Sequence, residues 1–382
     1  MRVIKKSVIN IYVMMLIQTV KYNESVIEAE YGNEGYSIVN YERSYSLNRA
    51  LINGRWIVYR GENRGEKGKN IQQSMKEFEI CDSYIHESIK SWIDKDQYLS
   101  ILDKIDLKEG YNIKLESKKI TKVIEIKDIK ECIEEKVVNN IKYNDTNFSY
   151  TGNPKDIPSI IEYLKGIGTQ TPAKNVVTES GKLTFIVDPE ILGTVLHYLL
   201  ADFLNGNMPK FKLNEKILGE ITIYDNPLNL FSPSFSVFDD EGVKTKKKEI
   251  IGDGIVTNYL GTLTSKYGEP GNARGILPKP DYFSIEVKNG DWSLNELLEE
   301  SKGSYIAIGS KKSELIKNSI RITPRTVIKI GQGPLFFREI AFPLQDLLTI
   351  DAITKETRGV FIDENHGGVL PYVRMKARAM IY

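Results

Sequence analysis

Three residues of the C-terminal half have side chains that could bind a metal ion. His197 and Asp202 lie five residues apart in an apolar segment, and His366 lies near the C-terminus in Glu-Asn-His-Gly-Gly. Imidazole nitrogens and carboxylate oxygens are common zinc ligands, and a catalytic zinc usually has three protein ligands. Zinc binding is therefore one chemistry that these residue types allow. The alternative is that His197 is a hydrogen-bonded histidine of a buried helix, with Asp202 a polar residue at its end.

The segment that carries His197 has strong signals of a helix start. Asp188 is a typical N-cap residue, Pro189 suits the first helical position, and Glu190 places a negative charge in the first turn. The residues that follow are apolar on most sides as far as residue 205. We therefore predict a central, buried helix that carries His197.

A second group of candidate residues lies in Gly-Glu-Pro-Gly-Asn-Ala-Arg, residues 268–274. Arg274 has a fork of N–H donors that could hold a carbonyl or carboxylate group, and Gly271 and Asn272 lie beside it. The alternative is structural, because Pro-Gly suits a tight turn and Asn272 could satisfy backbone groups of the loop. Gly271 fits the structural alternative better, whereas Arg274 fits both readings equally.

Length, composition and charge limit the classes of protein. The chain has 382 residues, enough for two domains, and is 41% hydrophobic and 27% charged, as soluble globular proteins are. Its 52 basic and 51 acidic residues leave a formal charge of +1, so no strong field favours nucleic acid or an anionic membrane. The apolar run 8–20 is shorter than the ~20 residues that span a bilayer, and no signal-peptide cleavage site follows it.

The number and spacing of the cysteines indicate in which cellular compartment the protein works. Cys81 and Cys132 do not form a Cys-x-x-Cys pair, and two cysteines in a chain of this length do not suggest a disulfide framework. We therefore expect reduced cysteines and a cytoplasmic protein.

Periodicity and turn residues predict an α+β fold with two domains. In the N-terminal part, strands are expected at 26–31, 36–41 and 55–60, separated by turns at 32–35 and at Asn53-Gly54. A polar linker at 169–173 divides a mixed α/β domain, 1–168, from a strand-rich domain around the buried helix, 169–382. Expected strands of the second domain are 183–187, 221–224, 234–238, 254–260, 282–287, 305–308, 325–330 and 373–382.

Several segments occur in an order that resembles the C-terminal domain of the TldD/PmbA family. They are Ser-Phe-Ser-Val-Phe-Asp-Asp-Glu-Gly-Val from residue 234, Gly-Asp-Gly-Ile-Val-Thr-Asn-Tyr-Leu from 252, Gly-Asn-Ala-Arg from 271, and Gly-Gly-Val-Leu-Pro-Tyr-Val-Arg from 367. This family comprises peptidase-related proteins also described as modulators of DNA gyrase. The resemblance implies that a zinc-bearing subunit carries His-Glu-x-x-x-His on a helix and a Cys near the C-terminus.

This chain departs from that motif. Aligned on the buried helix, His197 takes the first ligand position, Tyr198 the position of the catalytic Glu, and Asp202 that of the second His, and no cysteine follows Cys132. A phenol loses its proton only near pH ~10, so tyrosine is a poor general base. The motif positions His197, Tyr198 and Asp202 are therefore interpreted as vestigial.

The resemblance implies three readings of function. The first is a non-catalytic TldE/PmbA-like subunit without a cofactor, which pairs with a zinc-bearing TldD-type subunit to process unfolded or extended peptides and could form a homodimer alone. In the family the loop of Gly271, Asn272 and Arg274 lies beside the active cleft, so the resemblance implies that these residues hold the peptide. The second is a self-sufficient, divergent metallopeptidase with zinc on His197, Asp202 and His366. The third, a gyrase-associated or nucleic-acid-binding modulator, is disfavoured by the balanced charge.

Overall fold

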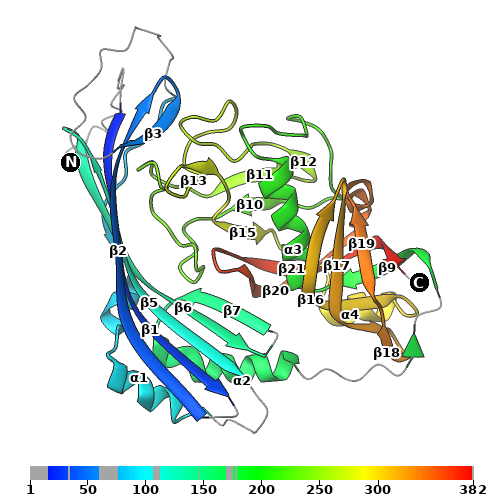
Figure 1. Ribbon diagram of the computed structural model, residues 1–382. Helices are drawn as coiled ribbons and strands as arrows, with labels where there is room; N and C mark the ends of the chain where they lie inside the picture. The colour runs from blue at the N-terminus through cyan, green and yellow to red at the C-terminus, as the bar shows by residue number, and fades with distance from the viewer. Residues whose placement is uncertain are drawn as a thin grey trace, which may run out of the picture.

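Two large β-sheets with few helices make up the protein. The computed structural model describes residues 16–32, 35–59, 76–105, 112–144, 146–168, 175–176 and 179–380, so residues 8–15 of the apolar run lie outside the described part. All strands of the first sheet come before residue 152, and all strands of the second come after residue 174 (Figure 1). The expected α+β class is confirmed, while the domain boundary at 168/169 stays a prediction.

The first sheet is built on a long antiparallel hairpin. Its order is β3-β2-β1-β5-β6-β4, with β7 paired to β6. In the β2–β3 turn, Asn53 and Gly54 both have positive φ, 51° and 72°, as the Asn-Gly pair predicts. The strands are β1 Leu16–Gly32, β2 Gly35–Ile52, β3 Arg55–Tyr59, β4 Tyr84–Ile85, β5 Ile113–Ile126, β6 Lys130–Tyr143 and β7 Thr146–Thr151.

Two short α-helices cover part of this sheet. α1 (Lys95–Leu102) and α2 (Ile157–Gly168) lie beside the first sheet (Figure 1). They bury Tyr98 and Ile161 in one apolar cluster with Ile141 of β6. The 3-10 helices η1 (Glu87–Ser91) and η2 (Pro154–Asp156) precede them. This arrangement gives the first sheet a core of its own.

The second sheet has twelve strands in the order β12-β11-β10-β15-β21-β9-β16-β17-β18-β8, with β19 joining β17 to β21 and β20 pairing with β21. A separate two-stranded sheet is formed by β13 and β14. The strands are β8 Asn175–Val176, β9 Gly181–Val187, β10 Ile223–Asp225, β11 Lys248–Gly252, β12 Ile255–Val256, β13 Ala273–Arg274, β14 Lys279–Pro280, β15 Ser284–Val287, β16 Tyr305–Ile316, β17 Ser319–Lys329, β18 Gly333–Phe336, β19 Glu339–Pro343, β20 Ala352–Asp363 and β21 His366–Met380.

The predicted buried helix forms the centre of the C-terminal core. α3 (Pro189–Tyr198) begins at Asp188, whose carboxylate accepts a hydrogen bond from the Ile191 N–H at 3.0 Å. Its apolar side chains pack with those of β9, β16, β17, β20 and β21. Figure 1 shows the helix beside these strands. The smaller α4 (Leu294–Glu300) has the expected capping box of Ser293 and Glu296. The 3-10 helix η4 (Leu344–Thr349) completes this half.

Buried charges connect the two sheets. We call Arg49, Lys122, Glu134, Lys136 and Glu241 the junction cluster, since the first four lie on the first sheet and Glu241 on a C-terminal loop. Glu134 accepts hydrogen bonds from the Val237 N–H and the Ser236 hydroxyl, at 2.7 and 2.9 Å. The loop 234–245 is therefore held against the first sheet. The expected strand at 234–238 is not formed, because this segment makes turns and directs its backbone groups to that contact.

The expectation of reduced cysteines is wrong for this structure. A disulfide joins Cys81 to Cys132, whose Cα atoms lie 6.0 Å apart and whose positions are 51 residues apart in sequence. Both residues are fully buried in an apolar cluster with Phe238 and Val243 of the C-terminal half. The two cysteines meet because β6 pairs with β4 in the folded sheet, and their spacing along the chain gave no sign of this.

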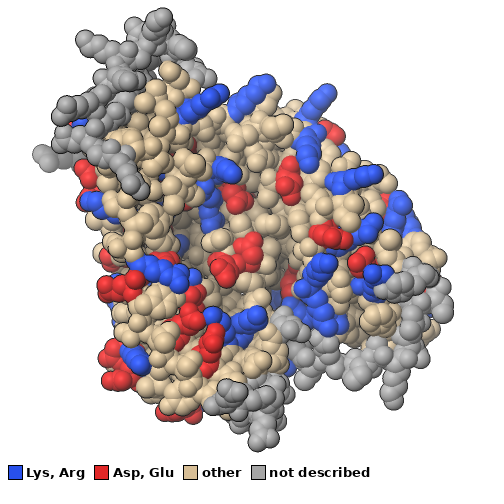
Figure 2. All heavy atoms as spheres, viewed as in Figure 1, with Lys and Arg blue, Asp and Glu red and all other residues tan. Residues whose placement is uncertain are grey.

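Among the described residues, no helix has the length and apolar character needed to cross a membrane. Basic and acidic side chains are interspersed over the face in Figure 2, as the balanced net charge implies.

Candidate functional site

α3 passes directly into a π-helical turn at the position of the candidate residues. The turn spans Leu199–Phe203 and follows His197 immediately. Residues five apart in an α-helix point about 140° apart, whereas i to i+5 hydrogen bonding brings them towards one side. The turn therefore moves Asp202 towards the side of His197, and the negative charge of Asp202 acts on the imidazole. π-turns of this kind occur often at functional sites.

His197 and His366 lie together, although 169 positions separate them in the sequence. Their ring centroids are 5.2 Å apart, and ligand atoms of His197, His366 and Asp363 all lie within 4.8 Å of one another. Asp363 ends β20 and His366 begins β21, so the β20–β21 hairpin turn brings both to the His197 end of α3. The structure thus joins two of the three residues of the predicted zinc set, with Asp363 rather than Asp202 as the third member.

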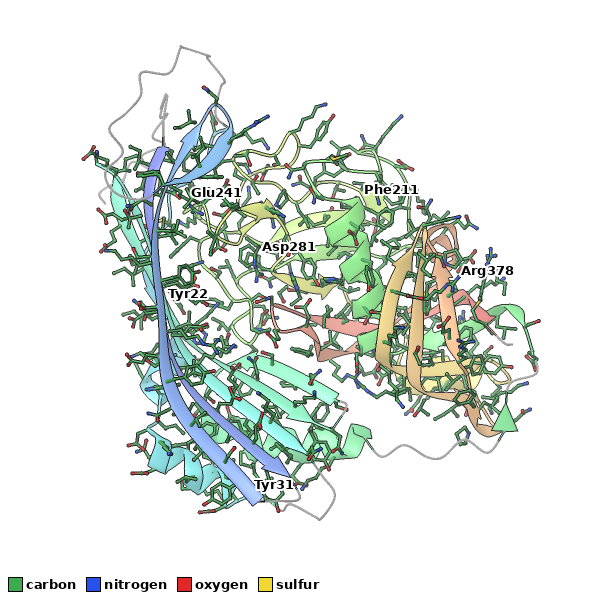
Figure 3. The ribbon with its side chains drawn as sticks, viewed as in Figure 1. Tyr22, Tyr31, Phe211, Glu241, Asp281 and Arg378 are labelled. Atoms are coloured by element: carbon green, nitrogen blue, oxygen red, sulfur yellow. A yellow bond between two sulfur atoms is a disulfide. The ribbon has the colours of Figure 1, made fainter. Side chains whose placement is uncertain are left out.

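Asp281 and Tyr282 also contact these residues. We call the whole group, His197, Asp281, Tyr282, Asp363 and His366, the histidine cluster. The Tyr282 hydroxyl lies 2.8 Å from His197 Nδ1, and Asp281 Oδ2 lies 3.0 Å from His366 Nε2. Both Asp363 oxygens lie 2.8 Å from His366 Nδ1. Figure 3 shows Asp281 within the C-terminal half, while Glu241 lies where this half meets the first sheet.

The two histidines have opposite electrostatic environments. Burial, together with the nearby charge of His366, lowers the pKa of His197. Burial alone would lower the pKa of His366 too, but its hydrogen bonds to Asp281 and Asp363 raise this pKa above the ordinary value. The same contacts hold the pKa of both carboxyl groups below their usual range, against the effect of burial. With both ring nitrogens facing carboxylates, His366 is an imidazolium donor in this arrangement.

Tyr198 points away from the cluster. Its hydroxyl lies 3.2 Å from Ser313 Oγ on β16, and only the edge of its ring approaches His197, at 5.4 Å between centroids. Asp202 is exposed and is not part of the group of three converging ligand atoms. Among the vestigial motif positions, only His197 therefore contributes to the cluster.

The residues predicted to bind peptide have different surroundings. Asn272 is fully buried, and its side chain accepts from Lys248 Nζ at 2.7 Å and donates to Asp225 at 2.5 Å. Gly271 has φ 111°, and a Cβ there would meet Lys248 Nζ at 3.3 Å. These contacts agree with the structural alternative for both residues.

Arg274 lies at the edge of the histidine cluster. Its guanidinium donates to the Tyr282 carbonyl at 3.2 Å and to the Asn365 carbonyl at 3.4 Å, and it lies over the ring of Phe283. These carbonyls belong to the two loops that carry Asp281 and His366, so Arg274 ties both loops together. Both acidic and basic side chains border the hollow between the two halves of the molecule (Figure 2).

Sequence reasoning missed Asp281, Tyr282 and Asp363. Asp363 had a local signal, because it precedes His366 by three residues in Asp-Glu-Asn-His, a spacing that a hairpin turn brings together. Asp281 and Tyr282 had none, since they reach the cluster only through the folded sheet.

Comparison with known proteins supplies the family. Residues 180–377 match the model of the PmbA/TldA metallopeptidase C-terminal domain. The chain belongs to this family. The match contains α3, the β20–β21 hairpin and the loop of Arg274, so the whole histidine cluster lies within the PmbA/TldA domain.

Curated relatives of the PmbA/TldA chain are metalloproteases. A metalloprotease of Methanocaldococcus jannaschii is 32% identical over 150 residues, 35% of this chain and 33% of the relative. A zinc metalloprotease TldD homolog of Saccharolobus solfataricus is 31% identical over 180 residues, 42% of this chain and 37% of the relative. The matches thus span about a third of the length of these relatives.

The whole fold has a counterpart among solved structures. TldE from Thermococcus kodakarensis superposes with a TM-score of 0.73, at 16% identity, over 95% of this chain and 96% of that chain. This likeness shows that the N-terminal sheet, which the family model does not cover, belongs to the same overall fold.

Proposed function

We propose that this chain is a non-catalytic, TldE-like subunit of a TldD/TldE-type metallopeptidase complex, which holds unfolded or extended peptides for a zinc-bearing TldD-type chain. The observation that carries the proposal is the residue after His197. A metallopeptidase needs a carboxylate that takes a proton from the metal-bound water. Here Tyr198 stands at that position, with its hydroxyl directed to Ser313.

The carboxylates nearest to His197 do not replace the missing base. Asp281 and Asp363 both lie at hydrogen-bond distance from His366, and these bonds stabilise their charged forms. A carboxylate stabilised in this way is a weaker proton acceptor. We therefore expect the chain to hydrolyse peptides poorly, if at all, without its partner.

Arg274 is the residue proposed to hold peptide. Its two terminal nitrogens each make one hydrogen bond to a backbone carbonyl, while a guanidinium has five N–H donors. It is half-buried beside the histidine cluster, where it contacts the backbone next to Asp281 and His366. Its remaining donors suit a carbonyl or carboxylate of an extended peptide.

The setting of the proposed complex follows the family resemblance. The chain would pair with a TldD-type chain, and we expect a homodimer when it is produced alone. A cytoplasmic location is kept as a proposal, although the Cys81–Cys132 disulfide removes the argument from reduced cysteines. A nucleic-acid partner is disfavoured by the net charge of +1.

The test is a peptidase assay on unfolded peptides with three samples: this chain, a TldD-type chain from the same organism, and their mixture. We expect no turnover by this chain alone and a mixture that exceeds the TldD-type chain by about tenfold or more. Full activity of this chain alone would overturn the proposal, and so would a mixture no better than the TldD-type chain.

Substitutions test the peptide-holding role. Arg274→Ala should raise the KM of the mixture for peptide by about tenfold, because a charge-assisted hydrogen bond contributes about 1.5–3 kcal/mol. Lys279→Ala is the matched control, since Lys279 is exposed on the strand paired with Arg274. Equal KM values for both variants would exclude Arg274 from peptide binding.

A further inference from the structure

We infer that His197, Asp363 and His366 form a binding site for one divalent transition metal ion of the zinc class. The inference goes beyond the proposed function, which assigns this chain no metal. It rests on three side chains, one from α3 and two from the β20–β21 hairpin, whose ligand atoms lie within 4.8 Å of one another. Atoms around a tetrahedral zinc lie about 3.3 Å apart, given bonds of about 2.0–2.1 Å, so small side-chain rotations would complete the site.

Hydrogen bonds around the cluster orient both imidazoles for a metal. Metal-binding histidines almost always use their second ring nitrogen in a hydrogen bond that fixes the ring and the tautomer. His197 Nδ1 lies 2.8 Å from the Tyr282 hydroxyl, which leaves Nε2 for the ion. His366 Nε2 lies 3.0 Å from Asp281, which leaves Nδ1 on the side of Asp363.

Asp363 is placed to act as the third ligand. Its oxygens lie 2.8 Å from His366 Nδ1, so the carboxylate and this nitrogen already approach one point. An ion there would replace the proton that His366 shares with Asp363, while the Asp281 contact stays. Asp363 is partly exposed, so the ion could enter from solvent and retain an open position for water or a peptide oxygen.

The chemistry of the donors selects the class of ion. Two imidazole nitrogens and one carboxylate oxygen suit zinc and neighbouring transition metals, whereas Mg²⁺ and Ca²⁺ prefer sites made of oxygen. The set also differs from the one expected from sequence. Asp202 lies on the same helical segment as His197, but it is exposed and outside the converging group.

The site is independent of hydrolysis. Tyr198 offers no carboxylate beside the ion, so bound metal would join α3 to the β20–β21 hairpin and present a Lewis-acidic position without a general base. The metal site could exist while the proposed subunit role fails, and the reverse also holds.

The experiment measures metal binding directly, on the full chain without a polyhistidine tag. Zinc and cobalt chlorides would be titrated by calorimetry, with zinc content after dialysis measured by mass spectrometry and Co²⁺ coordination by visible absorption. We expect one ion per chain, a rise in the melting temperature on loading, and no binding of Mg²⁺ at equal concentration. A wild-type chain that binds no zinc would overturn the inference.

Variants test each ligand. His197→Ala, His366→Ala and Asp363→Asn should each weaken zinc binding at least 100-fold, whereas Asp202→Asn should change it less than threefold. Circular dichroism of the metal-free variants establishes that each is folded. Unchanged affinity in the folded His197 and His366 variants would remove the site, and loss of affinity in Asp202→Asn would replace Asp363 by Asp202 as the ligand.

Discussion

The junction cluster and the histidine cluster are both groups of buried or half-buried ionisable side chains, yet their contacts differ. In the junction cluster, charges are directed at fixed groups of the other half of the molecule. Lys122 Nζ donates to the Phe238 carbonyl at 2.8 Å, and Glu241 accepts from the Trp56 indole at 2.7 Å. Such contacts hold two sheets together and leave few atoms for a ligand.

In the histidine cluster, side chains bond mainly to one another. His366 is held by Asp281 and Asp363, and His197 by Tyr282. Their remaining ligand atoms converge on one region. The comparison teaches that buried charge alone does not mark a functional site. What distinguishes the two clusters is whether the free atoms of several side chains approach a common point.

The largest effect on stability is expected in the junction cluster. Arg49 is fully buried and donates to Gln18 Oε1 at 3.0 and 2.8 Å and to the Asp240 carbonyl. Arg49→Met should lower the free energy of unfolding by about 3–5 kcal/mol, because nearby buried acidic groups lose their compensating charge. Urea denaturation measures it. Arg43→Met, at an exposed position of the same strand, is the control and should stay within about 0.5 kcal/mol.

The disulfide should stabilise the same junction. Replacing Cys81 and Cys132 by Ser removes a cross-link over 51 positions and should cost about 2–4 kcal/mol of unfolding free energy. Reductant should destabilise the wild type and leave the double variant unchanged, as thermal scans with and without reductant would show. Zinc affinity should not change, because the cysteines lie in the apolar cluster at the junction. Equal stability of both proteins under oxidising conditions would contradict a structural disulfide.

The junction should also respond to pH. Burial, together with the charge of Asp239, raises the pKa of Glu241 above its ordinary value. A carboxyl whose pKa is raised in the folded state stabilises the fold at low pH, and this contribution is lost as pH rises through the folded value. As the pH rises from 5 to 8, the free energy of unfolding of the wild type should fall by about 1–3 kcal/mol relative to that of Glu241→Gln. Denaturation at several pH values tests this, and parallel pH profiles of the two proteins would contradict it.

The smallest effect is expected beside the histidine cluster. Tyr198→Phe removes one hydrogen bond to Ser313 and should lower the free energy of unfolding by about 0.5–1.5 kcal/mol. Zinc affinity should stay within twofold of the wild type, since Tyr198 points towards β16. Thermal denaturation and calorimetry measure the two quantities. A large loss of zinc binding would place Tyr198 inside the histidine cluster and weaken the contrast between the two regions.

Local chemistry determined much of this protein from sequence alone. The Asp188-Pro189 start and the apolar residues that follow predicted α3 and its burial, and Asn53-Gly54 predicted the β2–β3 turn. Capping and positive φ depend on neighbouring residues, so the sequence shows them directly. The order of motifs in the second half also predicted the family, which the matched domain confirms.

Tertiary structure decided the rest. Asp281 and Tyr282 reach the histidine cluster through the order of strands in the second sheet. The cysteines meet because β6, which carries Cys132, pairs with β4, the strand that follows Cys81. The π-turn kept Asp202 on the His197 side, yet the β20–β21 hairpin supplied the carboxylate that joins the cluster. Contacts between distant segments depend on the packing of whole sheets, and residue types at a given spacing do not specify that packing.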